Sequence, residues 1–150
     1  GYYGNHMDEI ALMETIASSW RRLSAKRIRP FDISLLQYRL ILLARRKGSV
    51  SLSQAAEGLG CDRPGMTLLA RKCVRSGWLR RRRSTADRRS HRLELTGEGE
   101  ELLDAIEAAQ ASPSAAAADP LDVLAPVERE ALAEMLRRVR DRAEELRAGS

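Results

Sequence analysis

The sequence predicts a mainly α-helical protein with one small β-hairpin. Hydrophobic residues make up 43% of the chain but aromatic residues only 4%, so the core must consist mainly of Leu, Ile, Val and Ala. Along most of the chain, apolar residues recur at spacings of three and four, the period of one helix face. Near the middle, apolar and polar residues alternate instead, as in a half-buried strand. A length of 150 residues suits one domain or one dimer-forming subunit.

The first helix is expected from Asp8 to Lys26, and Pro30 ends this segment. A second helix follows and stops at Gly48. The residues expected to point inward are Ile10, Met13, Ile16, Ala17, Trp20 and Leu23 in the first helix, and Ile33, Leu36, Leu40, Leu43 and Ala44 in the second. Residues 1–6 resemble a vector-derived tag remnant and are left out of the fold prediction.

Two short helices are predicted in the middle of the chain. Ser51 and Gln54 form a capping-box pattern that opens the first of them, and Gly60 ends it. Asp62 caps the second, which Gly77 terminates. Two short helices joined by a tight glycine-containing turn form a helix-turn-helix.

A hairpin follows the helix-turn-helix. Its strands are predicted from Trp78 to Arg83 and from Ser90 to Leu95, with a polar turn between them. A hairpin in this place is a wing. Residues 31–96 are therefore predicted to form a winged helix-turn-helix lobe.

Two further helices are predicted after the wing, separated by a low-complexity break from Ala111 to Pro120. Thr96 caps the first, and the second starts near Pro126. Their inward residues are expected to be Leu102, Leu103, Ile106 and Ala109, and then Leu132, Leu136, Val139, Ala143 and Leu146 in a coiled-coil rhythm.

A monomer would leave part of the apolar stripes of the outer helices in water. Residues 7–30 and 97–150 are therefore predicted to form the helical dimerisation lobe of a two-fold homodimer. The alternative is that both stripes pack inside one subunit.

Positive charge is concentrated in one segment. The chain carries 26 Lys and Arg against 21 Asp and Glu, a net charge of +5. Residues 61–92 hold 11 bases and 2 acids, which gives +9 and leaves −4 for the rest of the chain. A concentrated basic surface suits a polyanion. Since the segment covers the second short helix and the wing, double-stranded DNA is the predicted partner.

The exposed face of residues 62–76 is predicted to enter the major groove, while Met66, Leu69, Ala70, Cys73 and Val74 face the core. Arg71 suits a bidentate contact with guanine, and Thr67 and Leu68 suit a thymine methyl group. The alternative for each arginine is a phosphate contact or a solvated charge. The predicted DNA-binding residues are Arg63, Pro64, Thr67, Leu68, Arg71, Arg75, Arg82, Arg88 and Arg89, with Arg88 or Arg89 in the minor groove.

The segment from Asp87 to Gly99, Asp-Arg-Arg-Ser-His-Arg-Leu-Glu-Leu-Thr-Gly-Glu-Gly, resembles the wing signature of the MarR (multiple antibiotic resistance regulator) family. Gly77-Trp78-Leu79 is similar to the family's exit from the recognition helix, and Leu124-Ala-Pro-Val-Glu128 resembles the opening of its last helix. The resemblance covers about Ile10 to Leu146. It departs at Leu68, where members often carry Arg, and at Pro64-Gly65.

The resemblance implies a pyramid-shaped homodimer that binds a palindromic operator, commonly as a repressor. It further implies that Asp87 forms a structural pair with a nearby arginine, with Arg89 at the family's arginine position. Members typically release DNA when a small phenolic or lipophilic effector binds between the lobes, or when a cysteine is oxidised. A regulator without a dedicated effector is the third option.

Trp20, Phe31, Tyr38 and His91 are the candidates for lining an effector cleft, although each also fits an ordinary core or interface position. Cys61 is the candidate redox residue, because a helix N-terminus lowers the pKa of a thiol. Cys73 is expected to lie in the core. A bridge between the two cysteines is not expected, since 12 residues of helix span about 18 Å.

No cofactor, metal site or enzymatic activity is predicted. Two cysteines and two histidines at unrelated spacings do not form a zinc site, and no nucleophile and base lie at a telling spacing. No signal peptide or apolar run of about 20 residues is visible, so a cytoplasmic protein is expected. The rival interpretation is a winged helix that binds proteins or RNA, or that binds nucleic acid without sequence preference.

Overall fold

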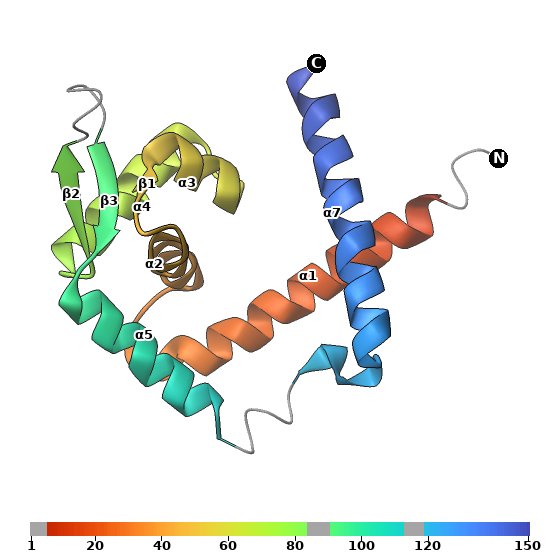
Figure 1. Cartoon of the computed structure of the whole chain (residues 1–150), viewed down its shortest axis with the longest axis horizontal. Coiled ribbons are helices and arrows are strands. Elements are labelled where there is room, and N and C mark those ends of the chain that lie inside the picture. The colour runs from red at the N-terminus through yellow and green to blue at the C-terminus, as the bar shows by residue number, and fades with distance from the viewer. Residues whose placement is uncertain (1–5, 84–90, 113–118) are drawn as a thin grey trace. The chain divides into compact units, whose positions relative to one another are not determined.

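A computed structural model describes residues 6–83, 91–112 and 119–150 (Figure 1). The chain forms two compact units, Gly1–Ala111 and Ser112–Ser150. The first unit contains α1 (His6–Ile28), a 3-10 turn (Arg29–Phe31), α2 (Leu35–Lys47), β1 (Val50–Ser51), α3 (Leu52–Leu59), α4 (Arg63–Arg75), β2 (Leu79–Arg83), β3 (His91–Leu95) and α5 (Gly97–Gln110). The second unit contains a 3-10 turn (Pro120–Val123) and α7 (Pro126–Ala148).

Side-chain caps set the starts of the two short helices. Ser51 Oγ accepts a hydrogen bond from the backbone N–H of Gln54 at 3.1 Å, and Asp62 Oδ1 accepts one from Gly65 at 2.6 Å. Between the helices, Gly60 takes a φ of 66°, which favours glycine. The predicted helix-turn-helix is therefore confirmed.

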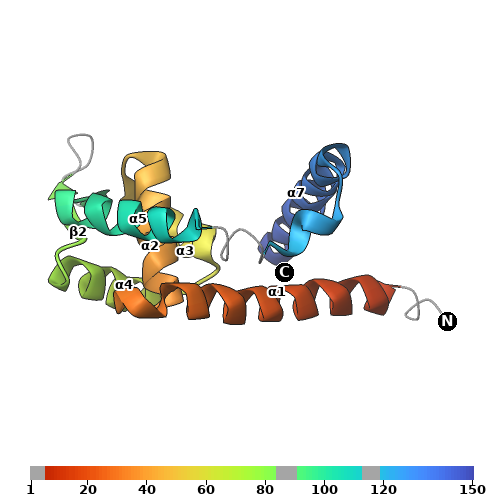
Figure 2. The same cartoon turned by 90° about the horizontal axis from the view of Figure 1, so that it is seen from below.

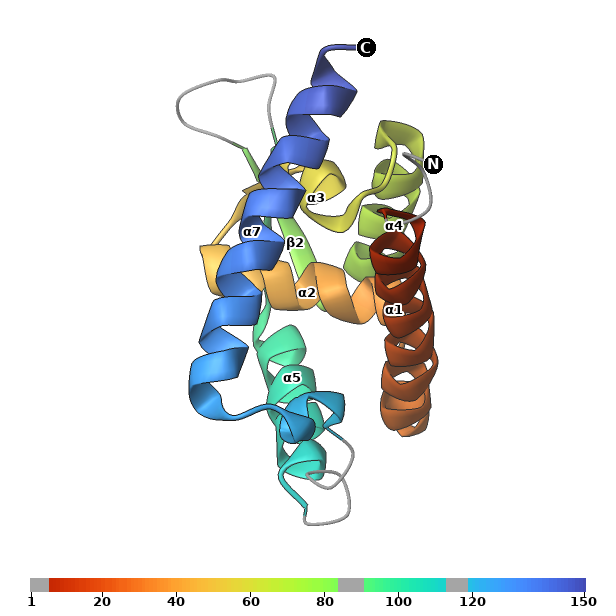
Figure 3. The same ribbon diagram turned by 90° about the vertical axis from the view of Figure 1, so that its right-hand side faces the viewer.

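α2 runs through the middle of the first unit, with α3, α4 and α5 around it (Figures 2 and 3). The buried core includes Leu40, Ile41 and Ala44 of α2, Met66, Ala70 and Cys73 of α4, and Leu103 and Ile106 of α5. Two residues predicted to point inward are exposed, namely Leu36 and Ala109. Each lies in a terminal turn of its helix, beyond the part that the rest of the unit covers.

The sheet has three antiparallel strands in the order β1-β3-β2, one more than the predicted hairpin. Val50 pairs with Leu93, and Leu79 pairs with Leu95. Val50, Leu79 and Leu93 are buried, so this face of the sheet packs on the core. The added strand is only two residues long and is recognisable only through its pairing with β3.

α1 extends about two residues past the predicted helix at each end. Its C-terminal part packs on the core, where Ile28 is buried. Its N-terminal part continues beyond the rest of the first unit (Figure 2). There Ile10, Ile16 and Trp20 are exposed by 46%, 59% and 43%. The stripe predicted to face inward is therefore open in the single chain.

α7 begins at Pro126, as predicted, and the Glu128 carboxylate accepts a hydrogen bond from the Ala125 amide at 2.9 Å. No residue of α7 is buried, and Leu136 and Val139 are 44% and 50% exposed. The second unit therefore has no core of its own. The dimerisation lobe stays a prediction.

Two predicted features fall partly or wholly outside the described residues: most of the tag remnant and most of the low-complexity break. His6, the last residue of the predicted remnant, begins α1. None of the described helices is long and apolar enough to span a membrane.

Candidate nucleic-acid interface

α4 has one buried face and one exposed face. Met66, Ala70 and Cys73 are 0% exposed and fix the helix against the core. On the opposite side, Leu68 is 51% exposed, although large apolar side chains are usually buried in a single chain. Pro64, Arg71 and Arg75 are also exposed there. The helix thus presents the face that the sequence predicted.

Local hydrogen bonds occupy the polar groups at the start of α4. The Arg63 guanidinium donates to the hydroxyl of Ser53 in α3, which ties the two helices of the helix-turn-helix together. The Thr67 hydroxyl donates to the Arg63 carbonyl at 2.9 Å. Between Arg63 and Arg71, the exposed face therefore offers the side chains of Pro64 and Leu68 and no spare side-chain donor.

Arg71 and Arg75 carry the available charge of this face. Neither forms an ion pair with any residue in 6–83, 91–112 or 119–150. A guanidinium has five N–H donors in a planar fork, which match the acceptors of guanine or of a phosphate. The exposed face of α4 can thus bind a polyanion without first breaking an internal pair.

The arginines of β2 are arranged differently. Glu94 of β3 lies between Arg80 and Arg82, with nitrogen–oxygen distances of 3.2 and 3.1 Å. The hydrogen bond from Arg82, followed by that from Arg80, holds the pKa of the Glu94 carboxyl below its ordinary value. Arg82, a predicted DNA contact, is therefore partly neutralised inside the sheet. The sequence analysis did not identify Glu94 as its partner.

Arg92 connects β3 to the helix-turn-helix. Its Nε donates to Ser49 Oγ at 2.7 Å, and its Nη2 donates to the Ser49 carbonyl at 3.0 Å and to Gln54 Oε1 at 3.3 Å. This arginine belongs to the basic segment of the sequence, but here it fastens the wing strand to α3. Asp87, Arg88 and Arg89 lie outside the described residues.

The two cysteines differ in environment. Burial raises the pKa of the Cys73 thiol to about 12, which confirms its predicted core position. Cys61 is half-buried, and its thiol donates to the Leu59 carbonyl at 3.8 Å. The predicted redox role of Cys61 stays a prediction.

The candidates for an effector cleft lie apart from the pocket of the first unit. That pocket is lined by Leu43, Lys47, Ser49, Val50, Gln54, Glu57, Gly58 and Arg92. Phe31 and Tyr38 pack against the core, while the exposed Trp20 ring has the Arg27 guanidinium 5.4 Å from its centre. His91 is exposed at the start of β3. A cleft lined by these four side chains remains a prediction.

Within the described part of the chain, no three His, Cys, Asp or Glu side chains group to hold a metal ion. The pocket and the α4 face are therefore the features that a binding partner could use.

Two comparisons of sequence agree with this architecture. Residues 33–91 match the model of the MarR family. An uncharacterised HTH-type transcriptional regulator of Bacillus subtilis (strain 168), YhbI, is 35% identical over 77 residues. That alignment covers 51% of this chain and 50% of YhbI, so the chain matches about half the length of this curated relative.

Solved structures share the fold over most of the chain. A cysteine-to-serine mutant of E. coli MarR complexed with operator DNA has a TM-score of 0.74 at 18% identity, covering 91% of this chain and 97% of that one. BpsR of Bordetella bronchiseptica, whose DNA binding is regulated by 6-hydroxynicotinic acid, has a TM-score of 0.70 at 20% identity, covering 87% and 91%.

These relatives are regulators rather than enzymes, in line with the sequence prediction. The mainly helical fold with a winged helix-turn-helix is the predicted one. The family match spans the described helix-turn-helix and both strands of the hairpin up to His91. The chain carries a MarR-family domain at residues 33–91 and belongs to the MarR family.

Proposed function

We propose that this chain is a homodimeric transcription regulator of the cytoplasm that binds a palindromic DNA operator. It acts as a repressor, because a dimer that covers a promoter excludes the transcription machinery. The observation that carries the proposal is the exposed face of α4, where Leu68 is 51% exposed and Arg71 and Arg75 have no ion pair with a described residue. The basic charge of residues 61–92 supports the same partner.

On DNA, α4 lies in the major groove. Arg71 binds the O6 and N7 acceptors of a guanine, since no internal carboxylate competes for its guanidinium. Leu68 contacts a thymine methyl group, the apolar group that base edges present in the major groove. Thr67 offers its methyl group as well, because its hydroxyl hydrogen is donated to the Arg63 carbonyl. Arg75 and the wing arginines bind phosphates.

Dimer formation is supported by the two apolar stripes that one chain leaves open. Ile10, Ile16 and Trp20 are exposed on α1, and Leu136 and Val139 on α7. Contiguous exposed apolar surface of this kind marks a protein interface. A two-fold axis would bury it and would place two copies of α4 about one helical turn of DNA apart.

A small phenolic or lipophilic effector that lowers DNA affinity is part of the proposal. It is supported by BpsR, whose DNA binding is regulated by 6-hydroxynicotinic acid. Oxidation of Cys61 is the alternative signal, because this half-buried thiol lies immediately before α4. Thiol-blocking reagents applied before a DNA titration distinguish the two signals.

The test is fluorescence anisotropy of the full chain with the DNA upstream of its own gene. A scrambled duplex of equal composition is the control, and salt is varied between about 50 and 200 mM. We expect at least about a thousandfold preference for the upstream DNA. Its half-sites should lie about 10 base pairs apart. Sedimentation of the free protein should give the mass of a dimer.

Equal, strongly salt-dependent affinity for both duplexes would instead identify a nonspecific nucleic-acid-binding module. No binding to either duplex at low salt, by a folded dimer, would contradict the DNA-binding function and favour a winged helix that binds proteins.

A further inference from the structure

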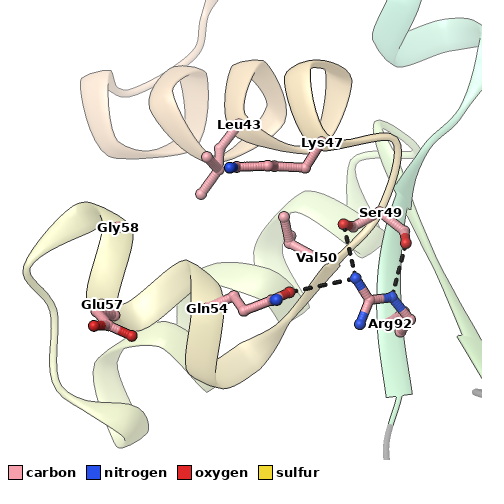
Figure 4. A pocket seen from close by; sticks show the side chains of 8 residues that line it. All are labelled: Leu43, Lys47, Ser49, Val50, Gln54, Glu57, Gly58 and Arg92. Atoms are coloured by element: carbon pink, nitrogen blue, oxygen red, sulfur yellow. Dashed lines mark hydrogen bonds between the residues drawn. The ribbon is translucent and has the colours of Figure 1, made fainter.

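A pocket of about 480 Å³ lies behind the helix-turn-helix (Figure 4). Leu43 and Lys47 of α2 form one wall, and Gln54, Glu57 and Gly58 of α3 form another. Ser49, Val50 and Arg92 close the end at the sheet. This volume falls in the range of sites for small organic molecules, about 300–1,000 Å³.

The inner surface of the pocket is apolar. Val50 is 1% exposed, and Leu43 packs against the core. At Gly58 the α3 wall carries no side chain, and a Cβ there would lie 3.3 Å from Leu43 Cδ2. The two helices therefore approach closely at this point. A flat or short apolar group fits such a floor better than a long chain.

Two cations border the pocket. Arg92 has only neutral partners among the described residues, namely the Ser49 hydroxyl and carbonyl and the Gln54 side-chain oxygen. Its third nitrogen, Nη1, makes no hydrogen bond to a described residue (Figure 4). Lys47 likewise forms no ion pair with a described residue. A half-buried guanidinium with two spare N–H donors favours an anion.

The contrast with the neighbouring arginines makes this arrangement informative. Glu94 is two residues from Arg92 on the same strand, yet it pairs with Arg80 and Arg82. Arg92 is thus left without a carboxylate in the described part of the chain, at the edge of a cavity. Glu57 on the α3 wall disfavours a polyanion and can accept a hydrogen bond from a hydroxyl or amine.

From these contacts we propose that the pocket between α2, α3 and β3 binds a small organic monoanion. Its carboxylate or similar group contacts Arg92 Nη1 and Lys47, and its apolar body lies on Leu43 and Val50. A ligand of about one aromatic ring with one carboxylate satisfies both requirements. The pocket lies within the first unit and does not include Trp20, Phe31 or Tyr38.

The position of Arg92 gives the site a route to DNA binding, a step that rests on the proposed function. Arg92 links β3 of the wing to Gln54, and Gln54 in turn accepts the Ser51 amide in the capping box of α3. An anion that shares Arg92 changes the hydrogen bonds that hold the wing strand to the helix-turn-helix. The ligand therefore biases the placement of two elements that face DNA.

The test titrates the ¹⁵N-labelled full chain with benzoate at constant ionic strength, without DNA. We expect saturable shifts of the amide signals of Ser49, Val50, Gln54 and Gly58. Benzamide, the neutral counterpart of benzoate, should bind at least about tenfold more weakly, as should inorganic phosphate, which lacks an apolar body. Because no DNA is present, this result is independent of whether the chain binds an operator.

Variants assign the two cations. Lys47→Gln and Arg92→Gln should each weaken benzoate binding by about tenfold. The matched control, Arg46→Gln, alters the exposed neighbour of Lys47 that does not line the pocket, and its affinity should equal that of the unaltered chain. Arg92→Lys retains the charge if Arg92→Gln unfolds the protein, and Lys47→Gln removes no printed internal contact.

Several results would overturn the proposal. These are shifts confined to other residues, equal binding of benzoate and benzamide, equal binding of benzoate and phosphate, or unchanged affinity in Lys47→Gln. If benzoate binds as proposed but does not alter the DNA anisotropy, the site stands and its link to DNA binding fails.

Discussion

α4 and the β2–β3 sheet are both rich in arginine, but they hold their charge differently. Arg71 and Arg75 on α4 are exposed and have no carboxylate partner in the described chain, whereas Arg80 and Arg82 share Glu94. Arg92 is tied to Ser49. The comparison teaches that formal charge along a sequence overstates the charge that is available to a partner. The part of the interface that reads bases is therefore expected on α4.

The largest effect should follow from removing the platform of α4. Met66→Ala deletes a side chain that is 0% exposed, and it should lower the free energy of unfolding by about 2–5 kcal/mol. Leu68→Ala, two residues away on the exposed face, should change it by less than about 0.5 kcal/mol. Urea denaturation measures both. Equal destabilisation by the two variants would mean that the buried and exposed faces of α4 are wrongly assigned.

A second substitution disturbs the joint between α4 and the sheet. A Cβ at Gly99 would overlap the carbonyl oxygen of Trp78 and lie 2.6 Å from Leu95 Cδ1. Gly99→Ala should therefore destabilise the protein by about 1–3 kcal/mol. Gly97→Ala is the control, because no atom lies within 4 Å of a Cβ there. The melting temperatures of both variants check this, and a stable Gly99→Ala protein would refute the close approach.

A smaller effect sharpens the reading role of α4. Replacing the thymine contacted by Leu68 with uracil removes one methyl group and should cost about 0.8 kcal/mol, roughly fourfold in affinity. In Leu68→Ala the same uracil substitution should have no effect, because the contact is already lost. Scanning each thymine of the half-site by anisotropy tests this. A fourfold loss that persists in Leu68→Ala would assign the methyl contact to another residue.

The smallest effect concerns the paired charges of the sheet. The pKa of Glu94 is lower in the folded chain than its ordinary value of 4.5. Its charged form therefore stabilises the fold above that value, and the contribution is lost as the pH falls through the lower folded pKa. The stability difference between the unaltered chain and Glu94→Gln should shrink as the pH falls from about 5 to about 3. A constant difference would show that Glu94 stays protonated or unpaired.

Local features were the predictable part of this fold. The caps at Ser51, Asp62 and Thr96 depend on residues three positions apart, so the sequence displays them directly. The buried and exposed faces of α4 follow from helical periodicity. The exposure of Leu36 was missed because periodicity does not say where the cover of a helix ends.

Features that depend on distant parts of the chain were not predictable. β1 has two residues and exists through its pairing with β3. The register of β2 and β3 places Glu94 opposite Arg80, and Arg92 meets Ser49 across 43 residues. Neither contact leaves a local pattern. The pocket arises from these same long-range contacts, so sequence reasoning assigned a cleft to aromatic residues instead.

The comparison of Arg71→Ala with Arg82→Ala tests the central claim most directly. Anisotropy on the operator and on a scrambled duplex gives the specificity of each variant, with Arg46→Ala as the exposed control. We predict that Arg71→Ala weakens operator binding by about 10- to 100-fold and the scrambled duplex far less, so that specificity falls. Arg82→Ala should weaken both by roughly threefold or less, because Glu94 already offsets its charge. An equal loss of specificity in both variants, or no loss in Arg71→Ala, would contradict the account.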